Sequence, residues 1–507
     1  MKTTMKNSLF LLLLWSMAAC SGGDRPAPLA PFIPPVATPS GVTEDPPGSD
    51  VHGQLVLGGP SHPPELIGCD ARRCRVKSLS AEIVSRLLEN PDRLLVFEPG
   101  ATPADLATLR LFPQIRRLEL SHLAITDLAF LGQARELVEL GLGRTGLKDL
   151  APLRFLKRLT HLVLFEVPFV DGAPLAALTE LRMLDLSRCP KVRDFTFLGS
   201  LVRLESLLLS GTAFADLSAL ASMTGLRELS LGQTQVPAEN LDALAGLTHL
   251  EGLHLDGLSR LSGLSALAGM TRLQHLGLSS TAVRDLSVLA RLVQLRSLKI
   301  NATPVVSLSP LAGSEHLHSL FMQDTKISDL SPLKGHQALR WLYASRTPVA
   351  NLSALAGLGL TTLDLGGTRV RNLGALSSCR QLERLFLGRT AVSDLAPLSG
   401  LPLQYLDLSY TKVSRLGPLA TSMNLKSVSL AYTAVKDLSP LAGLPALEML
   451  DITGVTPARP EILQGMAALK KLVFTDGVLD AAVRKSLADK GVELVVVPST
   501  QAIDSNK

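Results

Sequence analysis

From Leu118 onward the sequence repeats one pattern, LxxLxLxxTxVxDLSPLAGL, and this repetition leaves few folds open. Aligned on its second leucine, the pattern occurs in 17 copies, and eleven of the 16 spacings are 22 residues. Such self-similarity predicts a solenoid, in which each coil buries its apolar side against its neighbours. We call the aligned residue of each copy its anchor; the anchors are Leu118, Leu140, Leu162, Leu184, Leu207, Leu229, Leu253, Leu276, Leu298, Leu320, Leu342, Leu363, Leu385, Leu406, Val428, Leu450 and Leu472.

Each part of the repeat has a structural interpretation. The leucines of the LxL step are two residues apart, so both should point inward from a short strand, and stacked copies should form one parallel sheet on the concave side. Nine residues after the anchor an Asp recurs, as at Asp285 and Asp329, and Ser331-Pro332 illustrates a recurring Ser-Pro pair. These residues predict caps of short 3₁₀ turns on the convex side, because too few residues remain for a full α-helix.

The 22-residue length and the DLSPL segment resemble the internalin-like class of leucine-rich repeats, over roughly 70% of the chain. The resemblance implies an α/β solenoid, a horseshoe with a parallel concave sheet. In this class an Asn usually lies five residues after the anchor and bonds the turn backbone of adjacent coils. Thr holds this position in 11 copies, including Thr145 and Thr325. We expect its hydroxyl to do part of that work, because it both donates and accepts.

The N-terminus reads as a cleaved export signal. Lys2 and Lys6 precede a short apolar run, Leu9 to Trp15, which is too short to span a bilayer. The segment Met17-Ala18-Ala19-Cys20 resembles a bacterial lipobox, which implies that Cys20 becomes the lipidated first residue. Ser21 follows, and in Gram-negative lipoproteins the absence of an aspartate there favours the outer membrane. An ordinary cleaved signal with an incidental cysteine is the alternative.

A proline-rich tether follows the signal, with 11 prolines among residues 24–64. Such a segment stays extended and would hold the folded part off the membrane. Atypical segments flank the repeats and predict caps: a helix over 79–90 with a strand over 94–97, and a helix over 479–490 with a strand over 492–497. The predicted domains are 1–19 (lipoprotein signal peptide), 20–65 (lipidated Cys and tether), 66–114 (N-terminal cap), 115–474 (leucine-rich repeats) and 475–507 (C-terminal cap).

Four cysteines remain after Cys20. Cys69 and Cys74 lie close together, and outside the cytoplasm a disulfide between them is expected. Cys189 and Cys379 lie eight repeats apart, about 38 Å at ~4.8 Å per strand, which is beyond disulfide reach. Cys189 occupies the Thr position of its repeat and is predicted to be a buried structural residue.

The few aromatic residues are unevenly placed. Outward-facing concave positions lie one before and one, three, four and six after each anchor. Beyond the signal segment the chain has one Trp and four Tyr, and all five fall on these positions, where random placement would put about one. Because aromatic residues and arginine are enriched in binding hot spots, the concave face is the candidate ligand site. The predicted site residues are Phe321, Trp341, Tyr343, Arg346, Arg384, Phe386, Arg389, Tyr405, Tyr410 and Tyr432.

Two classes of function fit this face. The first is a protein or peptide binder at the cell envelope, and the second is a binder of an acidic glycan or other polyanion, whose affinity should fall steeply with salt. Nucleic acid is not the default partner, because the formal charge of +5 falls to +3 once Lys2 and Lys6 are removed with the signal. We expect no cofactor and no catalytic activity, and an enzyme remains a distant third.

Three weaker motifs were weighed against this interpretation. Gly141 to Gly146 matches GxGxxG, but no long helix follows, so an ordinary repeat is favoured over dinucleotide binding. His254 and His275, with Asp256, could hold a metal ion or form a polar surface cluster. Asp364 and Asp407 lie two strands apart, a separation that suits an inverting glycosidase, although a regular concave face offers no deep pocket.

Overall fold

The anchors lie in short strands that stack side by side. The structure is a computed structural model that describes residues 66–69, 73–76, 92–97, 100–237 and 241–499. Two compact units are distinguished, residues 1–53 and 54–507, and every described residue lies in the second. The predicted signal, lipobox and tether, and the predicted helix over 79–90, lie outside the described residues.

Most strands are three residues long and centred on an anchor. The strands are β1 (Leu66–Cys69), β2 (Arg73–Val76), β3 (Leu94–Phe97), β4 (Arg117–Glu119), β5 (Glu139–Gly141), β6 (His161–Val163), β7 (Met183–Asp185), β8 (Ser206–Leu208), β9 (Glu228–Ser230), β10 (Gly252–His254), β11 (His275–Gly277), β12 (Ser297–Lys299), β13 (Ser319–Phe321), β14 (Trp341–Tyr343), β15 (Thr362–Asp364), β16 (Arg384–Phe386), β17 (Tyr405–Asp407), β18 (Ser427–Ser429), β19 (Met449–Ile452), β20 (Lys471–Thr475) and β21 (Glu493–Val497).

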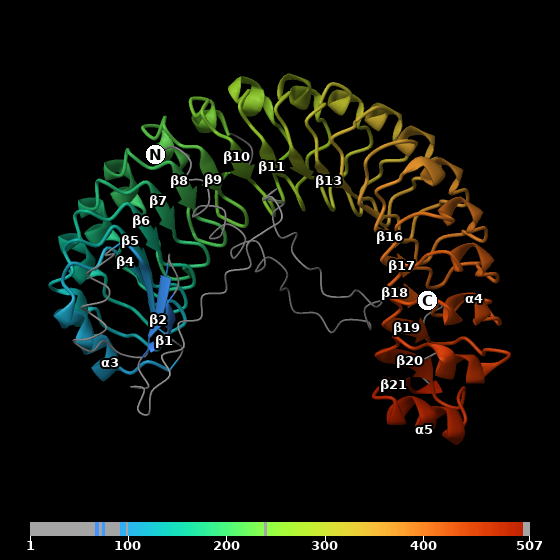
Figure 1. Cartoon of the computed structure of the whole chain (residues 1–507). Helices are drawn as coiled ribbons and strands as arrows, with labels where there is room; N and C mark the ends of the chain where they lie inside the picture. The colour runs from blue at the N-terminus through green and yellow to red at the C-terminus, as the bar shows by residue number, and fades with distance from the viewer. Residues whose placement is uncertain (1–65, 70–72, 77–91, 98–99, 238–240, 500–507) are drawn as a thin grey trace, which may run out of the picture. The chain divides into compact units, whose positions relative to one another are not determined.

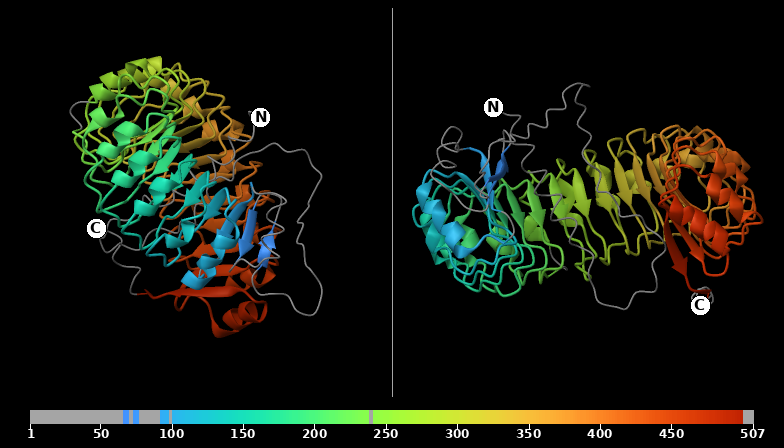
Figure 2. Two further views of the ribbon diagram at one scale, coloured as in Figure 1. Left: turned by 90° about the vertical axis from the view of Figure 1, so that its left-hand side faces the viewer. Right: turned by 60° about the horizontal axis from the view of Figure 1, so that its bottom comes forward.

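The strands form one sheet, and anchor pairs with anchor along it. Leu276, Leu298 and Leu320 are direct partners on β11, β12 and β13. Pairing is parallel from β2 to β21 and antiparallel between β1 and β2. Within the repeat unit the strands line the inner side of a curve and the helical turns lie outside it (Figures 1 and 2). The predicted parallel concave sheet is confirmed.

The convex side carries the predicted 3₁₀ turns, and three short α-helices lie among them. No helix in the described part of the chain is both long and apolar enough to cross a membrane. The 3₁₀ turns are η1 (Thr108–Leu111), η2 (Ala129–Leu131), η3 (Ala151–Phe155), η4 (Ala173–Ala177), η5 (Thr196–Ser200), η6 (Leu217–Leu220), η7 (Asp242–Leu244), η8 (Ser265–Gly269), η9 (Ser287–Arg291), η10 (Ser309–Leu311), η11 (Ser331–Leu333), η12 (Ser353–Leu355), η13 (Gly374–Ser378), η14 (Ala396–Leu398), η15 (Gly417–Leu419) and η16 (Pro460–Gly465), and the α-helices are α3 (Pro103–Ala107), α4 (Ser439–Ala442) and α5 (Ala481–Asp489).

Aspartate caps these turns as predicted, but serine does not. Asp329 Oδ1 accepts the backbone N–H of Ser331 at 2.8 Å, and Asp285 does the same for Ser287. Ser331 is itself the first residue of η11, and its hydroxyl donates to Asp329 Oδ2 at 2.7 Å. The predicted role of Ser as cap was therefore wrong, because the carboxylate two residues earlier already accepts the free N–H.

The Thr side chains also act differently from the prediction. All eleven donate to the carbonyl oxygen three residues earlier in their own coil, as Thr325 does to Met322 at 2.8 Å. A Thr has one proton to donate, so this bond uses the donor that the resemblance assigned to an adjacent coil. Only the Cys at this position reaches its neighbour: Cys189 Sγ donates to Leu164 of the preceding coil at 3.1 Å.

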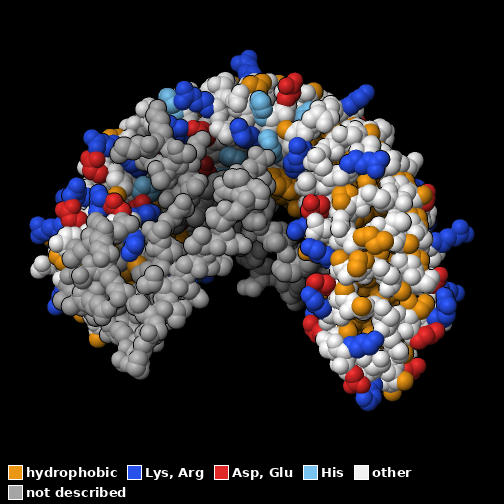
Figure 3. Space-filling model, in the orientation of Figure 1, with side chains coloured by type: hydrophobic (Ala, Val, Ile, Leu, Met, Phe, Trp, Pro, Cys, Tyr) orange, Lys and Arg blue, Asp and Glu red, His pale blue; other side chains and the backbone are white. Residues whose placement is uncertain are grey.

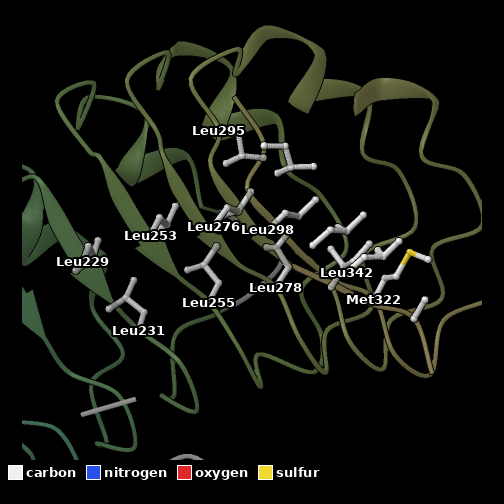
Figure 4. Close-up of a cluster of buried hydrophobic side chains, with 14 of the residues drawn as sticks. Leu229, Leu231, Leu253, Leu255, Leu276, Leu278, Leu295, Leu298, Met322 and Leu342 are labelled. Carbon is white, nitrogen blue, oxygen red and sulfur yellow. The ribbon is translucent and has the colours of Figure 1, made fainter. Parts of the chain in front are cut away.

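Leucine fills the interior in layers. Leu298 is fully buried, and Figure 4 shows the anchors Leu229, Leu253, Leu276 and Leu298 in line through successive coils. Each layer packs mainly against the layers before and after it. Cys189 and Cys379 are buried and unpaired, which confirms the structural prediction for Cys189, and burial raises the pKa of its thiol to about 12.

Both ends of the solenoid are closed by distinct elements. At the C-terminal end α5 and β21 confirm the predicted helix and strand, and at the other end β3 confirms the strand over 94–97. Cys74 on β2 is disulfide-bonded, and Cys69 on β1 is its direct neighbour in the antiparallel register. The register is consistent with the predicted Cys69–Cys74 pair.

We predict that Leu298→Ala lowers the free energy of unfolding by about 2–5 kcal/mol, through lost transfer energy and the cavity left behind. Urea denaturation followed by circular dichroism measures the loss. Val306→Ala is the control, since Val306 is 60% exposed and should cost about 0.5 kcal/mol or less. Equal effects of the two changes would contradict the register.

Candidate functional site

The ten predicted site residues lie in three parallel rows along the concave face. The row one residue before the anchor contains Trp341, Arg384 and Tyr405, and all three are half-buried. The row one after the anchor contains Phe321, Tyr343 and Phe386, also half-buried. The remaining four, Arg346, Arg389, Tyr410 and Tyr432, lie four residues after the anchor. The rows run across strands β13 to β18.

Adjacent coils bring some of these side chains into contact. The rings of Phe321 and Tyr343 stack with centroids 4.9 Å apart and an interplanar angle of 6°. The guanidinium of Arg384 lies 4.8 Å from the ring centroid of Tyr405. Such ring and cation–π contacts hold the side chains in one orientation, so that part of their ordering cost is met before a ligand arrives.

The row four after the anchor has a backbone feature that the sequence analysis missed. Arg346, Arg389, Tyr410 and Tyr432 all adopt positive φ angles between 55° and 59°, and the equivalent residue of every other coil except the last also has a positive φ. Only glycine adopts this left-handed region at no steric cost. Gly211, Gly257, Gly367 and Gly454 occupy this position in other coils, and that recurrence was a usable signal.

The left-handed turn aims these side chains at their neighbours in adjacent coils. Tyr410 and Tyr432 stack at 4.5 Å, and the Arg389 guanidinium lies 4.4 Å from the Tyr410 ring centroid. Arg346 forms a two-pronged ion pair with Asp324, with its Nε 2.6 Å from Oδ1. The ion pair with Asp324 raises the pKa of Arg346, so this cation keeps its charge.

The structure does not join the ten residues into one continuous cluster. Among the described residues no ring contact connects Trp341 or Phe386 to another aromatic side chain. Phe386 pairs with Asp364 on one side and with Asp407 on the other, so aromatic and acidic residues alternate along its row. The site is a set of separate contact points on the concave face of the sheet.

The two aspartates of this row are half-buried acids without a cationic partner. No ion pair in the described chain involves Asp364 or Asp407. Asp364 Oδ1 accepts the N–H of Gly366 at 3.0 Å, and Asp407 Oδ1 that of Ser409 at 2.8 Å. Burial raises the pKa of both carboxyl groups above the ordinary range. They satisfy backbone donors, a role that accounts for their recurrence without any catalysis.

The histidine cluster makes polar contacts with neighbouring carboxylates. His254 Nε2 lies 3.0 Å from Oε1 of Glu228 on the neighbouring strand, and its Nδ1 lies 3.9 Å from Oδ2 of Asp256. Burial lowers the pKa of His275, which favours its neutral form. The described residues contain no group of three or more ligands suited to a metal ion. The sequence analysis missed Glu228, although it lies one residue before its anchor, the position that His275 occupies in its own coil.

The GxGxxG segment is an ordinary coil. Gly141 ends β5, Arg144 adopts the left-handed turn, and only the five-residue η3 follows. A Cβ at Gly143 would lie 2.2 Å from the Phe165 ring, so neighbouring side chains occupy the space where a phosphate would have to bind.

A shallow basic hollow borders the aromatic rows. It is lined by Arg369, Arg371, Arg389 and Lys412, with the ring of Tyr410 beside them. The sequence analysis did not select Arg371, because it lies outside the strand positions that were counted. The four cations come from three successive coils and meet only when those coils stack.

No protein-family model matches the chain, and no curated protein matches it in sequence. Among solved structures, an internalin from Listeria monocytogenes is 27% identical and covers 60% of this chain and 83% of its own, with a TM-score of 0.48. A leucine-rich-repeat protein from Leptospira interrogans is 18% identical and covers 78% of this chain and 99% of its own, with a TM-score of 0.58. A plant peptide hormone receptor in complex with RGF2 is 16% identical over 85% of this chain and 70% of its own, with a TM-score of 0.54.

The fold is a leucine-rich-repeat solenoid. The parallel sheet and the 3₁₀ turns described above fit this fold, and the likeness to the Leptospira and plant structures concerns the fold alone. In leucine-rich-repeat proteins the scaffold is generic and the surface side chains are specific, so the function of this chain has to be argued from its own concave face.

We predict that replacing Asp364 and Asp407 together by Asn raises stability at neutral pH. A folded-state pKa above the ordinary 3.8 means that ionisation destabilises the fold, so the cost appears as pH rises past 3.8 and is absent at lower pH. Urea denaturation at pH 7 and at about pH 3 should show a gain that shrinks on acidification.

Asp329→Asn is the control for that measurement. Hydrogen bonds from Ser331 lower the pKa of Asp329, so its ionised form stabilises the fold and the Asn variant should lose stability at pH 7. A double variant that is less stable than wild type at pH 7 would contradict the assignment.

Proposed function

We propose that this leucine-rich-repeat protein is a non-enzymatic, membrane-anchored binding protein that holds a protein or peptide partner on its concave face. The observation that carries the proposal is the concentration of the Trp and Tyr residues on outward positions of β14 to β18. A solenoid surface without a ligand has no need to gather its Trp and Tyr residues on one face.

The chemistry of the face supports a polypeptide partner. Half-buried rings offer flat apolar contacts, as at Trp341 and Phe386, and arginine forks offer bidentate bonds. Carboxylates lie between the rings, as at Asp364, and can accept N–H groups. A polypeptide presents apolar, acidic and amide groups in turn, so it can match a surface on which these features alternate.

A polyanion matches the concave face less well. Asp364 and Asp407 lie on either side of Phe386 in its row, and a continuous acidic polymer would meet like charge at both. Salt titration separates the two ligand classes, since binding of a polyanion weakens steeply with salt through counterion release.

The proposed location rests on the N-terminal sequence. The charged start, the apolar run and the small residues before Cys20 resemble a lipoprotein signal, which would anchor the protein in the cell envelope, with the outer membrane as the expected site. The proline-rich segment would then act as a spacer that holds the concave face away from the bilayer.

We predict that Trp341→Ala with Tyr405→Ala weakens partner binding by about 1–2 kcal/mol per ring, while each change alters stability by about 0.5 kcal/mol or less. Cross-linking and capture from intact envelopes, followed by affinity measurement with the recovered partner, tests this. The matched control is Phe155→Ala with Val170→Ala, which removes two side chains that are 50% and 60% exposed, one of them on the convex turn η3. Unchanged binding by a folded double variant would move the site elsewhere.

We predict that Cys20→Ser releases the protein from the membrane fraction, because the acyl chains that would attach to Cys20 supply the anchoring energy. Cell fractionation with immunoblotting measures the distribution, and Cys379→Ser serves as a control at a buried cysteine. Full retention of the Cys20 variant in membranes would contradict the anchor.

A further inference from the structure

Charge pairing between adjacent coils is a regular feature of this solenoid. Arg182 pairs with Glu205 at 2.5 Å and Arg227 with Glu251 at 2.5 Å, each across one coil. The ion pair of Arg346 with Asp324 follows the same rule. Equivalent positions of neighbouring coils lie about 4.8 Å apart, so opposite charges at the same position meet without strain.

Two described stretches depart from this rule: residues 257–323 and the longer residues 347–436. Residues 347–436 are all described and contain no ion pair. They hold nine Lys and Arg against four Asp and Glu, a formal net charge of +5, which equals the net charge of the whole chain. These four coils therefore carry an excess of positive charge that no ion pair in the described structure offsets.

The unpaired cations converge on the basic hollow. Arg369, Arg371, Arg389 and Lys412 line it, and no carboxylate does. Within the described structure, no hydrogen bond or ion pair uses the side-chain nitrogens of these four residues. A second hollow provides the contrast: its Arg182 and Arg227 are each paired with a Glu of a neighbouring coil.

The neighbouring Tyr410 fixes one of the four cations. Its ring lies under the Arg389 guanidinium and stacks on Tyr432, so the planar fork is oriented before any ligand binds. Four like charges around one hollow repel one another, and an anion between them replaces repulsion with charge-assisted hydrogen bonds. Figure 3 shows Lys and Arg side chains along the inner margin of the arm that carries β16 to β18.

We propose that this basic hollow binds an acidic segment of the polypeptide partner, while the aromatic rows hold the adjoining residues. The inference rests on the proposed function and specifies the chemistry of its partner. The three coils that line the hollow span about 10 Å. An extended peptide advances about 3.3 Å per residue, so three to five residues suffice to place two or three carboxylates over it. Asp364 and Asp407 on the adjacent concave face would repel further negative charge. They therefore favour a partner with a short acidic segment over a uniformly charged polymer.

The test uses the full chain and a simple probe, a fluorescent poly-L-glutamate of about 20 residues, followed by fluorescence anisotropy. The hollow variant carries Arg369→Ser, Arg389→Ser and Lys412→Ser. The matched control carries Arg158→Ser, Arg203→Ser and Arg227→Ser, which removes the same charge from arginines that are already ion-paired. We expect the hollow variant to bind the probe at least about tenfold more weakly than wild type, and the control to stay within about twofold.

Three results would overturn the inference. One is the absence of probe binding by wild type, and another is an equal loss in both variants, which would indicate attraction by net charge alone. The third is tighter binding of heparin or an oligothymidylate of equal charge, which would assign the hollow to a polyanion. The Trp341/Tyr405 variant should still bind poly-L-glutamate, so loss of probe binding in the hollow variant is distinguishable from failure of the aromatic site.

Discussion

No coil of this protein is stable alone, because each depends on its neighbours for both apolar contacts and backbone hydrogen bonds. Leu298 is buried only when the coils before and after it are in place. The backbone follows the same logic: the N–H groups of Ile300 and Ala302 donate to carbonyl oxygens of the next coil, each at 2.8 Å. Because of this dependence, the sequence has to specify the register between adjacent coils. The buried anchors do so, since each pairs with the anchor of the next coil.

Because the register between coils is strict, side chains at equivalent positions of successive coils lie in rows on the surface. A side chain at a given position of one coil lies about 4.8 Å from its equivalent in the next, so rows behave as functional units. The same position carries the Arg346–Asp324 ion pair and the Tyr410–Tyr432 stack. The left-handed turn at this position occurs with glycine and non-glycine residues alike. The backbone hydrogen bonds between coils therefore impose the turn, whichever side chain is present.

A ligand is best held where charged side chains of the rows have no ion-pair partner within the protein. Charges that pair across one coil, as Arg182 does with Glu205, have less to offer a ligand. The four cations of the basic hollow and the carboxyl groups of Asp364 and Asp407 have no such partner, and they lie beside half-buried rings. This combination of oriented rings and unpaired charge distinguishes the concave face around β14 to β18 from the rest of the structure.

The sequence alone determined the fold and the phase of every side chain, because a 22-residue period with buried anchors admits one way of stacking. It therefore placed Trp341 and Tyr405 on the concave face and the caps at Asp285 and Asp329. Contacts between coils depended on the tertiary structure. Whether Arg389 lies over Tyr410 and whether Arg389 and Lys412 meet at the hollow depend on side chains 20 or more residues apart, whose separation is set by stacking and twist rather than by spacing along the chain.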